Sequence, residues 1–259
     1  MACLVAISTA VLLGLQPAGR RDDALTGMSF VLVPAGQFEM GTPPTEAQRE
    51  PQETVHHVTI SRAFYLATHE VTQREWRTVM DGNPSHFAAC GPDCPVEMVT
   101  FFDVEQFIAR LDARSGWPGF RLPTEAEWEF ACRAGGTEAF GSSRSLSTDA
   151  ANFDGRFPYG GGPTGRYRGT PTPVGSFAAN RWGLFDMSGN VWEWTSDAHC
   201  PYPSGSVDDP VATCQSPVKV IRGGSWFFGA DSARCGLRYT HRPQDRGFSL
   251  GVRLAHEAK

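Results

Sequence analysis

The part of the chain that follows Gly141 shows almost no helical periodicity, and glycine, proline, asparagine and aromatic residues dominate it. The 28 glycines and 19 prolines of the chain recur without a short period, which argues against a low-complexity sequence. With 41% apolar and 20% charged residues, the chain can still bury a sizeable core. These features predict a compact domain built largely from ordered loops, and such loops usually serve binding or catalysis.

Three helices are predicted in the middle of the chain, because a capping box marks the start of each one. The boxes are Thr72-Gln-Arg-Glu75, Thr100-Phe-Phe-Asp103 and Thr124-Glu-Ala-Glu127, and the helices should end near Met80, Ala113 and Gly135. Short strands are expected twice within 29–40, at 57–66, and at 183–186, 191–195, 218–222 and 250–254. No internal repeat or linker divides the sequence, so the pattern predicts one α+β domain.

An apolar run from Cys3 to Ala18 opens the chain and is followed by Gly19-Arg-Arg-Asp-Asp23. It is short for a membrane span and has the length of the apolar part of a signal peptide. We therefore expect residues 1–18 to be a signal peptide and the mature protein to be periplasmic or secreted. No other segment is apolar and long enough to cross a membrane, so no span is expected in the mature chain.

The cysteines also indicate an oxidising compartment. Cys90 and Cys94 flank three residues, and Cys200 and Cys214 bracket a loop rich in proline, glycine and aspartate. Both pairs are predicted to form disulfides. Half of a zinc site is the alternative for the first pair, but no second Cys/His pair at zinc spacing accompanies it. Cys132 and Cys235 remain: either they pair with each other, or Cys235 is a free thiol.

The net charge of −5 argues against a general nucleic-acid-binding protein. The segment 219–259 runs against this trend, since it holds eight Lys or Arg residues and three acidic ones. Two readings stay open for these cations. They are buried arginines paired with acids elsewhere in the fold, or they form a positive rim around a cleft.

Four stretches carry a family resemblance. They are Phe30-Val-Leu-Val-Pro-Ala-Gly-Gln-Phe-Glu-Met-Gly41, Arg121-Leu-Pro-Thr-Glu-Ala-Glu-Trp-Glu129, Gly189-Asn-Val-Trp-Glu-Trp-Thr195 and Arg222-Gly-Gly-Ser-Trp226, with His69-Glu-Val-Thr72 in support. In this order and spacing the sequence resembles the formylglycine-generating enzyme (sulfatase-modifying factor) family over roughly 27–256. The resemblance implies an α+β, compact, loop-rich fold related to C-type lectins, with little regular secondary structure.

The resemblance also implies a copper chemistry. Enzymes of the family oxidise a cysteine of a sulfatase to formylglycine with O2 and Cu(I), and two thiolates, which are soft ligands, hold the copper. Cys235 with Arg238 matches the second of these cysteines, but Ala230 stands where the first would be. We therefore expect a binding or maturation-type paralogue with a peptide or protein ligand. The alternative is an active oxidoreductase that converts a peptide cysteine to formylglycine with Cys235 as thiolate ligand.

Calcium is the other cofactor that the resemblance implies. The matching positions are Asp186, the carbonyls of Gly189 and Val191, and Glu193, and this mixture of oxygens suits Ca²⁺. The alternative is an aspartate that caps a turn beside a surface glutamate. A second family site would use Asn152 and the Phe153 carbonyl. Its remaining positions fall at Arg166 and Arg168, and an arginine there would fill the place of the ion.

The tryptophans of the family motifs have two interpretations. Trp192, Trp194 and Trp226 are a sugar-stacking platform, or they belong to the core. Aromatic residues at alternating positions in a loop-rich fold favour the core.

Overall fold

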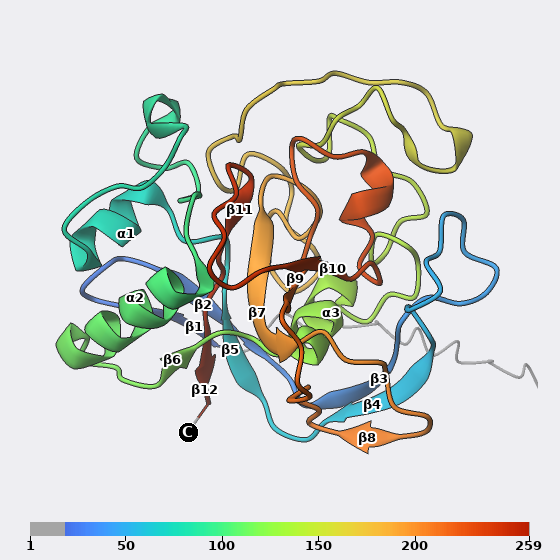
Figure 1. Cartoon of the computed structure of the whole chain (residues 1–259), viewed down its shortest axis with the longest axis horizontal. Helices are drawn as coiled ribbons and strands as arrows, with labels where there is room; N and C mark the ends of the chain where they lie inside the picture. Colours follow the sequence, from blue (N-terminus) through green and yellow to red (C-terminus); the bar gives the residue numbers. More distant parts are fainter. Residues whose placement is uncertain (1–18, 259) are drawn as a thin grey trace, which may run out of the picture.

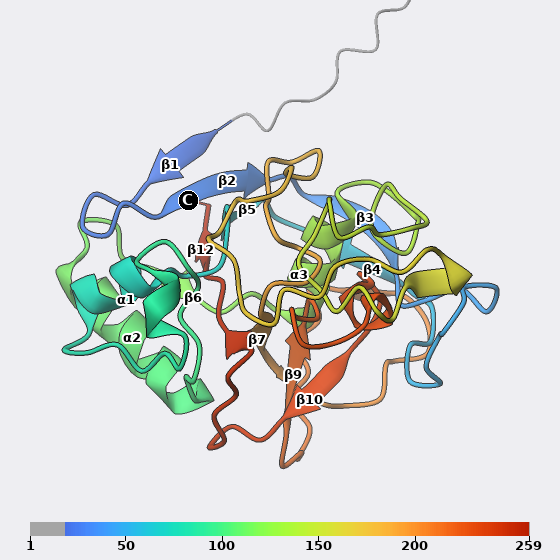
Figure 2. The ribbon, with the colours of Figure 1, turned by 90° about the horizontal axis from the view of Figure 1, so that it is seen from above.

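Three small sheets and three α-helices are joined by long loops in the computed structural model, which describes residues 19–258 (Figure 1). The predicted signal peptide lies outside the described residues. The segment of roughly 140–190, drawn in yellow-green, covers one side of the molecule with irregular loops in both ribbon views (Figure 2). No helix of the described part has the length and apolar character that a bilayer crossing requires.

The three predicted helices are present and begin where their capping boxes stand. They are α1 (Gln73–Val79), α2 (Phe101–Arg114) and α3 (Glu125–Arg133), with Thr72, Thr100 and Thr124 as N-caps. In each box the threonine side chain accepts from the backbone N–H three residues on, and the acidic side chain there accepts from the N–H of the cap. Each cap is worth about 1 kcal/mol, so these local interactions fix the helix starts.

The largest sheet has five antiparallel strands in the order β1-β2-β5-β12-β6. The strands are β1 (Arg20–Asp22), β2 (Ser29–Val33), β5 (Phe64–Ala67), β12 (Ala255–Glu257) and β6 (Phe120–Arg121). The chain termini of the described part therefore meet in one sheet. Apolar residues of β2 and β5 pack with Trp117, Phe120 and Phe107 of the segment around α2 in one buried core.

Two smaller sheets complete the fold. The four-stranded sheet has the order β10-β9-β7-β11 and the three-stranded sheet the order β3-β4-β8. Their strands are β7 (Trp192–Ala198), β9 (Lys219–Arg222), β10 (Tyr239–His241) and β11 (Leu250–Gly251), and β3 (Gly36–Met40), β4 (His56–Ile60) and β8 (Val207–Asp208). Short 3-10 turns lie at Ala88–Cys90, Tyr159–Gly161 and Ala230–Ala233.

Some predicted strands differ from the structure. The expected strand at 57–66 is two strands, because the polar break at Ser61 and Arg62 lets β4 join one sheet and β5 another. The prediction at 183–186 is wrong: Gly183 and Asp186 both have positive φ, which interrupts an extended chain. At 250–254 only Leu250–Gly251 is a strand. The other strands form close to their predicted positions.

Three disulfides link the described chain. Cys90–Cys94 and Cys200–Cys214 form as predicted. Cys132 and Cys235, whose pairing the sequence left open, are bonded to each other across 103 residues. This bond joins α3 to the segment that follows the 3-10 turn Ala230–Ala233.

Candidate functional site

Four arginines of the basic C-terminal segment are buried and paired with acids. Their exposed fractions are 0% for Arg222, 0% for Arg234, 2% for Arg238 and 0% for Arg253. Each guanidinium forms an ion pair with a buried glutamate. The buried reading of these cations is therefore the one that holds, and these four do not form a positive rim.

Helix α3 supplies the acids of one buried group of charges. Glu125 accepts from Arg238 Nε at 2.9 Å and Nη2 at 2.7 Å, and Glu129 accepts from Arg133 Nη2 at 2.7 Å and from Arg222. We call these five residues the α3 charge cluster. Burial alone would raise the pKa of Glu129, but the charges of Arg133 and Arg222 outweigh it and lower that pKa. The cluster has two carboxylates and three guanidiniums, so each of its carboxylates has an arginine partner.

Cys235, the candidate copper ligand, lies beside this cluster with its sulfur in the disulfide to Cys132. It is fully buried, and its backbone carbonyl accepts from Arg222 Nη1 at 2.9 Å. Ala230 is fully buried too and packs with Phe153 and Tyr159 in a small apolar cluster. All six cysteines within residues 19–258 are in disulfides. A disulfide sulfur is not a thiolate, so this form of the protein presents no thiolate pair at positions 230 and 235.

A second buried group of charges lies where the end of β5, the loop before β7 and the segment after β11 meet. It consists of Glu70, Asp186, Glu193 and Arg253, which we call the Glu70 cluster. Glu193 is fully buried; it accepts from Arg253 Nη2 at 2.7 Å and from Trp128 Nε1 at 2.6 Å. The surface-glutamate alternative is therefore wrong. Asp186 has φ of +55° and accepts from the Gly175 N–H at 2.6 Å.

Glu70 is the member of this cluster that the sequence reasoning missed. Its side chain is fully buried, and neither carboxylate oxygen has a hydrogen-bond partner. Burial first, and then the charge of Asp186, raise the pKa of Glu70 well above its ordinary value. Burial also raises the pKa of Asp186. The signal in the sequence is the His69-Glu-Val-Thr72 stretch, which belongs to the family resemblance and contains this glutamate.

The Glu70 cluster has the composition of a cation site. Three carboxylates face a single guanidinium, and two oxygens lack any donor. Gly189 and Val191 lie in the same loop, where their carbonyls would add the neutral oxygens that Ca²⁺ accepts. Within residues 19–258 no three Asp, Glu, His or Cys side chains converge at metal-binding distance. In this cluster Arg253 and Trp128 hold Glu193. Glu70 and Asp186 are the carboxylates left free of arginine contacts.

The second candidate calcium site contains an arginine instead. Asn152 donates to the Thr170 carbonyl at 3.0 Å, and Phe153 packs in the apolar cluster with Ala230. Arg168 donates to the Thr148 carbonyl at 2.7 Å and lies 3.4 Å from the Ala151 carbonyl, next to Asn152 in the chain. The guanidinium of Arg168 lies close to this position and would oppose a metal ion there, whereas Asn152 Oδ1 is buried without a hydrogen-bond partner.

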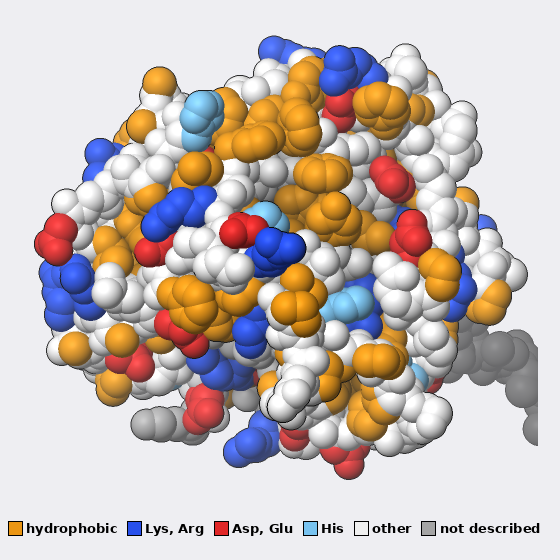
Figure 3. All heavy atoms as spheres, viewed as in Figure 1, with side chains coloured by type: hydrophobic (Ala, Val, Ile, Leu, Met, Phe, Trp, Pro, Cys, Tyr) orange, Lys and Arg blue, Asp and Glu red, His pale blue; other side chains and the backbone are white. Residues whose placement is uncertain are grey.

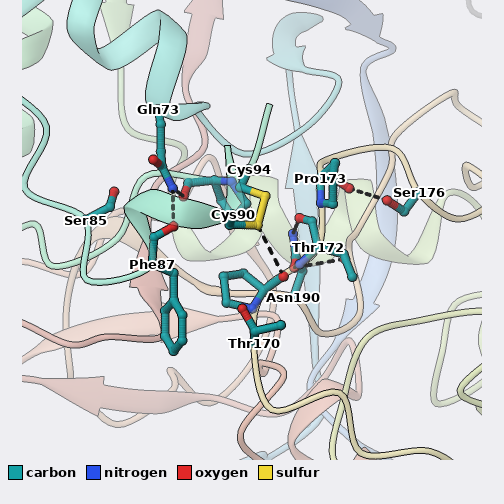
Figure 4. Close-up of a disulfide and its surroundings, with 12 residues drawn as sticks. Gln73, Ser85, Phe87, Cys90, Cys94, Thr170, Thr172, Pro173, Ser176 and Asn190 are labelled. Atoms are coloured by element: carbon teal, nitrogen blue, oxygen red, sulfur yellow. Dashed lines mark hydrogen bonds between the residues drawn. A yellow bond between two sulfur atoms is a disulfide. The ribbon is translucent and has the colours of Figure 1, made fainter. Parts of the chain in front are cut away.

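The loop of the Glu70 cluster is tied to the Cys90–Cys94 disulfide through its neighbours (Figure 4). Asn190 Oδ1 accepts from the Thr172 N–H at 2.9 Å, and Cys90 Sγ lies 3.4 Å from the Pro171 carbonyl. On the other side of the disulfide, Gln73 Nε2 donates to the Phe87 carbonyl at 3.2 Å. These contacts hold the segment 170–175, and with it the Gly175 N–H that reaches Asp186.

The three motif tryptophans belong to the core. Trp192, Trp194 and Trp226 are 2%, 0% and 4% exposed, which excludes them as an open stacking platform. Apolar side chains do gather on the surface over β10 and β11 (Figure 3). The exposed aromatic residues Phe227, Tyr239 and Phe248 lie in this region and contact the buried tryptophans or one another.

Known proteins resemble the chain throughout. Residues 17–258 match the family described as "Sulfatase-modifying factor enzyme 1-like domain". The "Formylglycine-generating enzyme" of Mycobacterium tuberculosis is 41% identical over 66% of this chain and 60% of its own length. The "Hercynine oxygenase" of Mycolicibacterium smegmatis is 32% identical over 92% of this chain and 63% of its own length. The chain thus spans less than two thirds of the length of either relative.

Two solved structures have the same fold. PvdO from Pseudomonas aeruginosa is 28% identical, with a TM-score of 0.78 over 94% of this chain and 99% of that one. Treponema denticola variable protein 1 is 24% identical, with a TM-score of 0.79 over 92% of this chain and 99% of that one. The predicted loop-rich α+β fold is confirmed.

Proposed function

The chain belongs to the family of sulfatase-modifying factor enzyme 1-like domains, and from this premise we propose that it is a binding or maturation-type member. In this proposal it recognises a peptide or protein and does not oxidise a cysteine with copper. The observation that carries the proposal is the Cys132–Cys235 bond together with Ala230. A dithiolate copper site needs two free thiolates, and this form of the protein supplies none at these positions.

The second candidate function is a copper-dependent oxidase that converts a peptide cysteine to formylglycine. The 41% identity to a protein of that name supports it. It requires that the Cys132–Cys235 bond opens, so that Cys235 becomes a thiolate, and that another group replaces the missing thiolate at position 230. Within 19–258 every other cysteine is also in a disulfide. The replacement would therefore need to be a nitrogen ligand, or a thiolate released when a second disulfide opens.

One assay separates the two candidates. Purified protein, Cu(I) and O2 are incubated with a Cys-x-Pro-x-Arg peptide, and mass spectrometry follows the loss of the thiol. We expect no conversion, either in the oxidised protein or after mild reduction. Turnover by the wild type that disappears in Cys235→Ser would overturn the proposal.

A matched pair of variants extends the assay. Cys132→Ser frees Cys235 alone, whereas Cys132→Ser with Ala230→Cys gives two cysteines five residues apart. Copper binding by the double variant and none by the single one would show that the scaffold lacks only the second thiolate. Tight Cu(I) binding by the single variant would favour the oxidase.

We also propose that the Glu70 cluster binds one calcium ion. Glu70, Asp186 and the carbonyls of Gly189 and Val191 would hold it, and Glu193 would complete the set after exchanging part of its contact with Arg253. The ion would supply the positive charge that three buried carboxylates lack, and would fix the loop that leads into β7. Its role is structural, because the ion would be enclosed by protein groups.

Export to the periplasm or the outside of the cell completes the proposal. Three disulfides persist in oxidising compartments, and a calcium site of moderate affinity fills where calcium is plentiful. Peptide mapping of exported protein under non-reducing conditions tests this. A chain that begins near Gly19 with all three bonds is expected, whereas an intact Met1 would refute the leader.

A further inference from the structure

A cavity of about 510 Å³ is lined by residues of β3, β4 and β8. The N-terminus of α3 and the loop closed by Cys200–Cys214 form its other walls (Figure 1). Met40, Ala126, Tyr202, Val207 and Val211 give it apolar walls. Its volume falls within the range of small-molecule pockets, about 300–1,000 Å³.

The charged residues of the cavity are mostly acids. Glu125, Asp197, Asp208 and Asp209 line it, and Arg238 is their single guanidinium. Because Glu125 and Arg238 form a two-bond ion pair, the three aspartates are left in excess. Asp197 is 3% exposed and receives the Glu125 and Ala212 N–H groups at 2.8 Å, but has no arginine partner. Burial first, and then the charge of Glu125, raise the pKa of Asp197 to about 6.

His56 adds an acceptor that has no partner. The side chain is 5% exposed and lines the cavity, with its ring 4.5 Å from that of Tyr202. Its Nδ1 lies 3.2 Å from the Thr54 carbonyl, which only accepts, so Nδ1 carries the hydrogen. In the neutral ring Nε2 then has a lone pair, and no group among residues 19–258 donates to it.

We propose that this cavity binds a small organic cation, namely a protonated amine carried on an apolar body. The ammonium group donates to His56 Nε2 and is attracted by Asp197 and the aspartates at the mouth. The apolar body packs against Tyr202, Val207 and Ala126. An anion is repelled by the same aspartates, and a neutral molecule of the same shape lacks the charge that they attract. Neither Cys235 nor Ala230 lines the cavity, and the proposal does not depend on the proposed function.

Three probes of the same shape and different charge test the proposal. Phenethylamine, 2-phenylethanol and 3-phenylpropionate are titrated in EDTA at pH 7.5, and amide chemical shifts report where each one binds. Phenethylamine should shift residues around His56, Asp197 and Tyr202, with an affinity at least about tenfold above that of the alcohol, as a hydrogen bond to a charged group allows. The phenylpropionate should leave these shifts unchanged. Equal binding of the alcohol, or no amine shifts in this region, would overturn the proposal.

Variants then tie binding to individual groups. His56→Phe keeps a ring against Tyr202 and removes the acceptor, so amine affinity should fall about tenfold. Asp208→Asn removes an exposed charge at the mouth and should weaken binding roughly two- to fivefold, whereas Glu105→Gln, an equally exposed charge on α2, should not. If His56→Phe fails to fold, Val211→Lys at the exposed mouth should repel the amine. Unchanged affinity in Asp208→Asn and Val211→Lys would refute the assignment.

Discussion

The α3 charge cluster and the Glu70 cluster are both buried, yet they shift the pKa of a glutamate in opposite directions. In the first, three guanidiniums surround two carboxylates, and the pKa of Glu129 is lowered. In the second, three carboxylates share Arg253, and the pKa of Glu70 is raised. Burial of charged side chains by itself therefore does not indicate a ligand site. Buried carboxylates without enough counter-charge do, because a buried anion without a cation beside it is costly unless a ligand supplies one.

The largest expected effect comes from removing one arginine of the α3 charge cluster. Arg222→Met removes the cation that contacts Glu129 and the Cys235 carbonyl, and leaves a buried carboxylate with less compensation. Breaking a buried pair in this way costs about 3–5 kcal/mol of unfolding free energy, which urea denaturation measures. Arg144→Gln, in an exposed pair with Glu138, is the control and should change nothing measurable. Similar losses in both variants would contradict the distinction.

Asp197, a carboxylate next to the α3 charge cluster without an arginine partner, should make the free energy of unfolding depend on pH in the opposite sense to Glu129. Asp197 has its pKa raised from 3.8 to about 6, so the folded state keeps the proton to higher pH than the unfolded chain does. Its contribution to stability is therefore lost as the pH rises from 3.8 through about 6, by up to about 3 kcal/mol relative to Asp197→Asn. Glu129 has a lowered pKa, so relative to Glu129→Gln its contribution is lost as the pH falls below 4.5. Chemical denaturation at several pH values measures both, and slopes of the same sign would refute the contrast.

Within the Glu70 cluster, Glu193 should behave like a member of a balanced pair. Glu193→Gln weakens two-point contact with Arg253 and the bond from Trp128, so it should cost about 2 kcal/mol in EDTA. Urea denaturation of metal-free protein measures this loss. A variant as stable as wild type would mean that Arg253 is satisfied by its bonds to the Ala67 and Phe185 carbonyls alone.

The smallest effect should come from Glu70→Gln in the same metal-free protein. Since the Glu70 oxygens have no donor and face the charge of Asp186, removing this acid should be neutral or stabilising by at most about 1 kcal/mol. Thermal unfolding in EDTA checks it beside Glu193→Gln. A loss as large as that of Glu193→Gln would show that Glu70 is an ordinary structural carboxylate.

The sequence predicted the parts of the fold that local interactions decide. The helix starts follow from side chains three residues apart at Thr72, Thr100 and Thr124, and two disulfides close short loops. The splitting of 57–66 depends on which sheet each half joins, which is a property of the whole fold. The Cys132–Cys235 bond spans 103 residues, so the sequence could only leave both of its alternatives open.

The candidate site was predicted in part for the same reason. Asp186, Gly189 and Val191 lie in the loop before β7, and Glu193 is the second residue of that strand, so their spacing can be read directly from the sequence. Glu70 lies in the connection between β5 and α1 and meets Asp186 only in the folded chain. Arg253 follows β11, and its hold on Glu193 could not be seen before the sheets were assembled. The excess of negative charge in the Glu70 cluster comes from residues of three segments that lie far apart in the sequence, so no single segment reveals it.

Calcium-dependent thermal unfolding of wild type and Glu70→Gln tests the contrast between the clusters most directly. With free calcium a hundredfold above its dissociation constant, wild type should gain about 2.7 kcal/mol over the protein in EDTA. Glu70→Gln should lose most of that gain, although it is no less stable than wild type in EDTA. An unchanged wild-type melting curve in calcium, or an equal gain in Glu70→Gln, would contradict the assignment of the Glu70 cluster as a cation site.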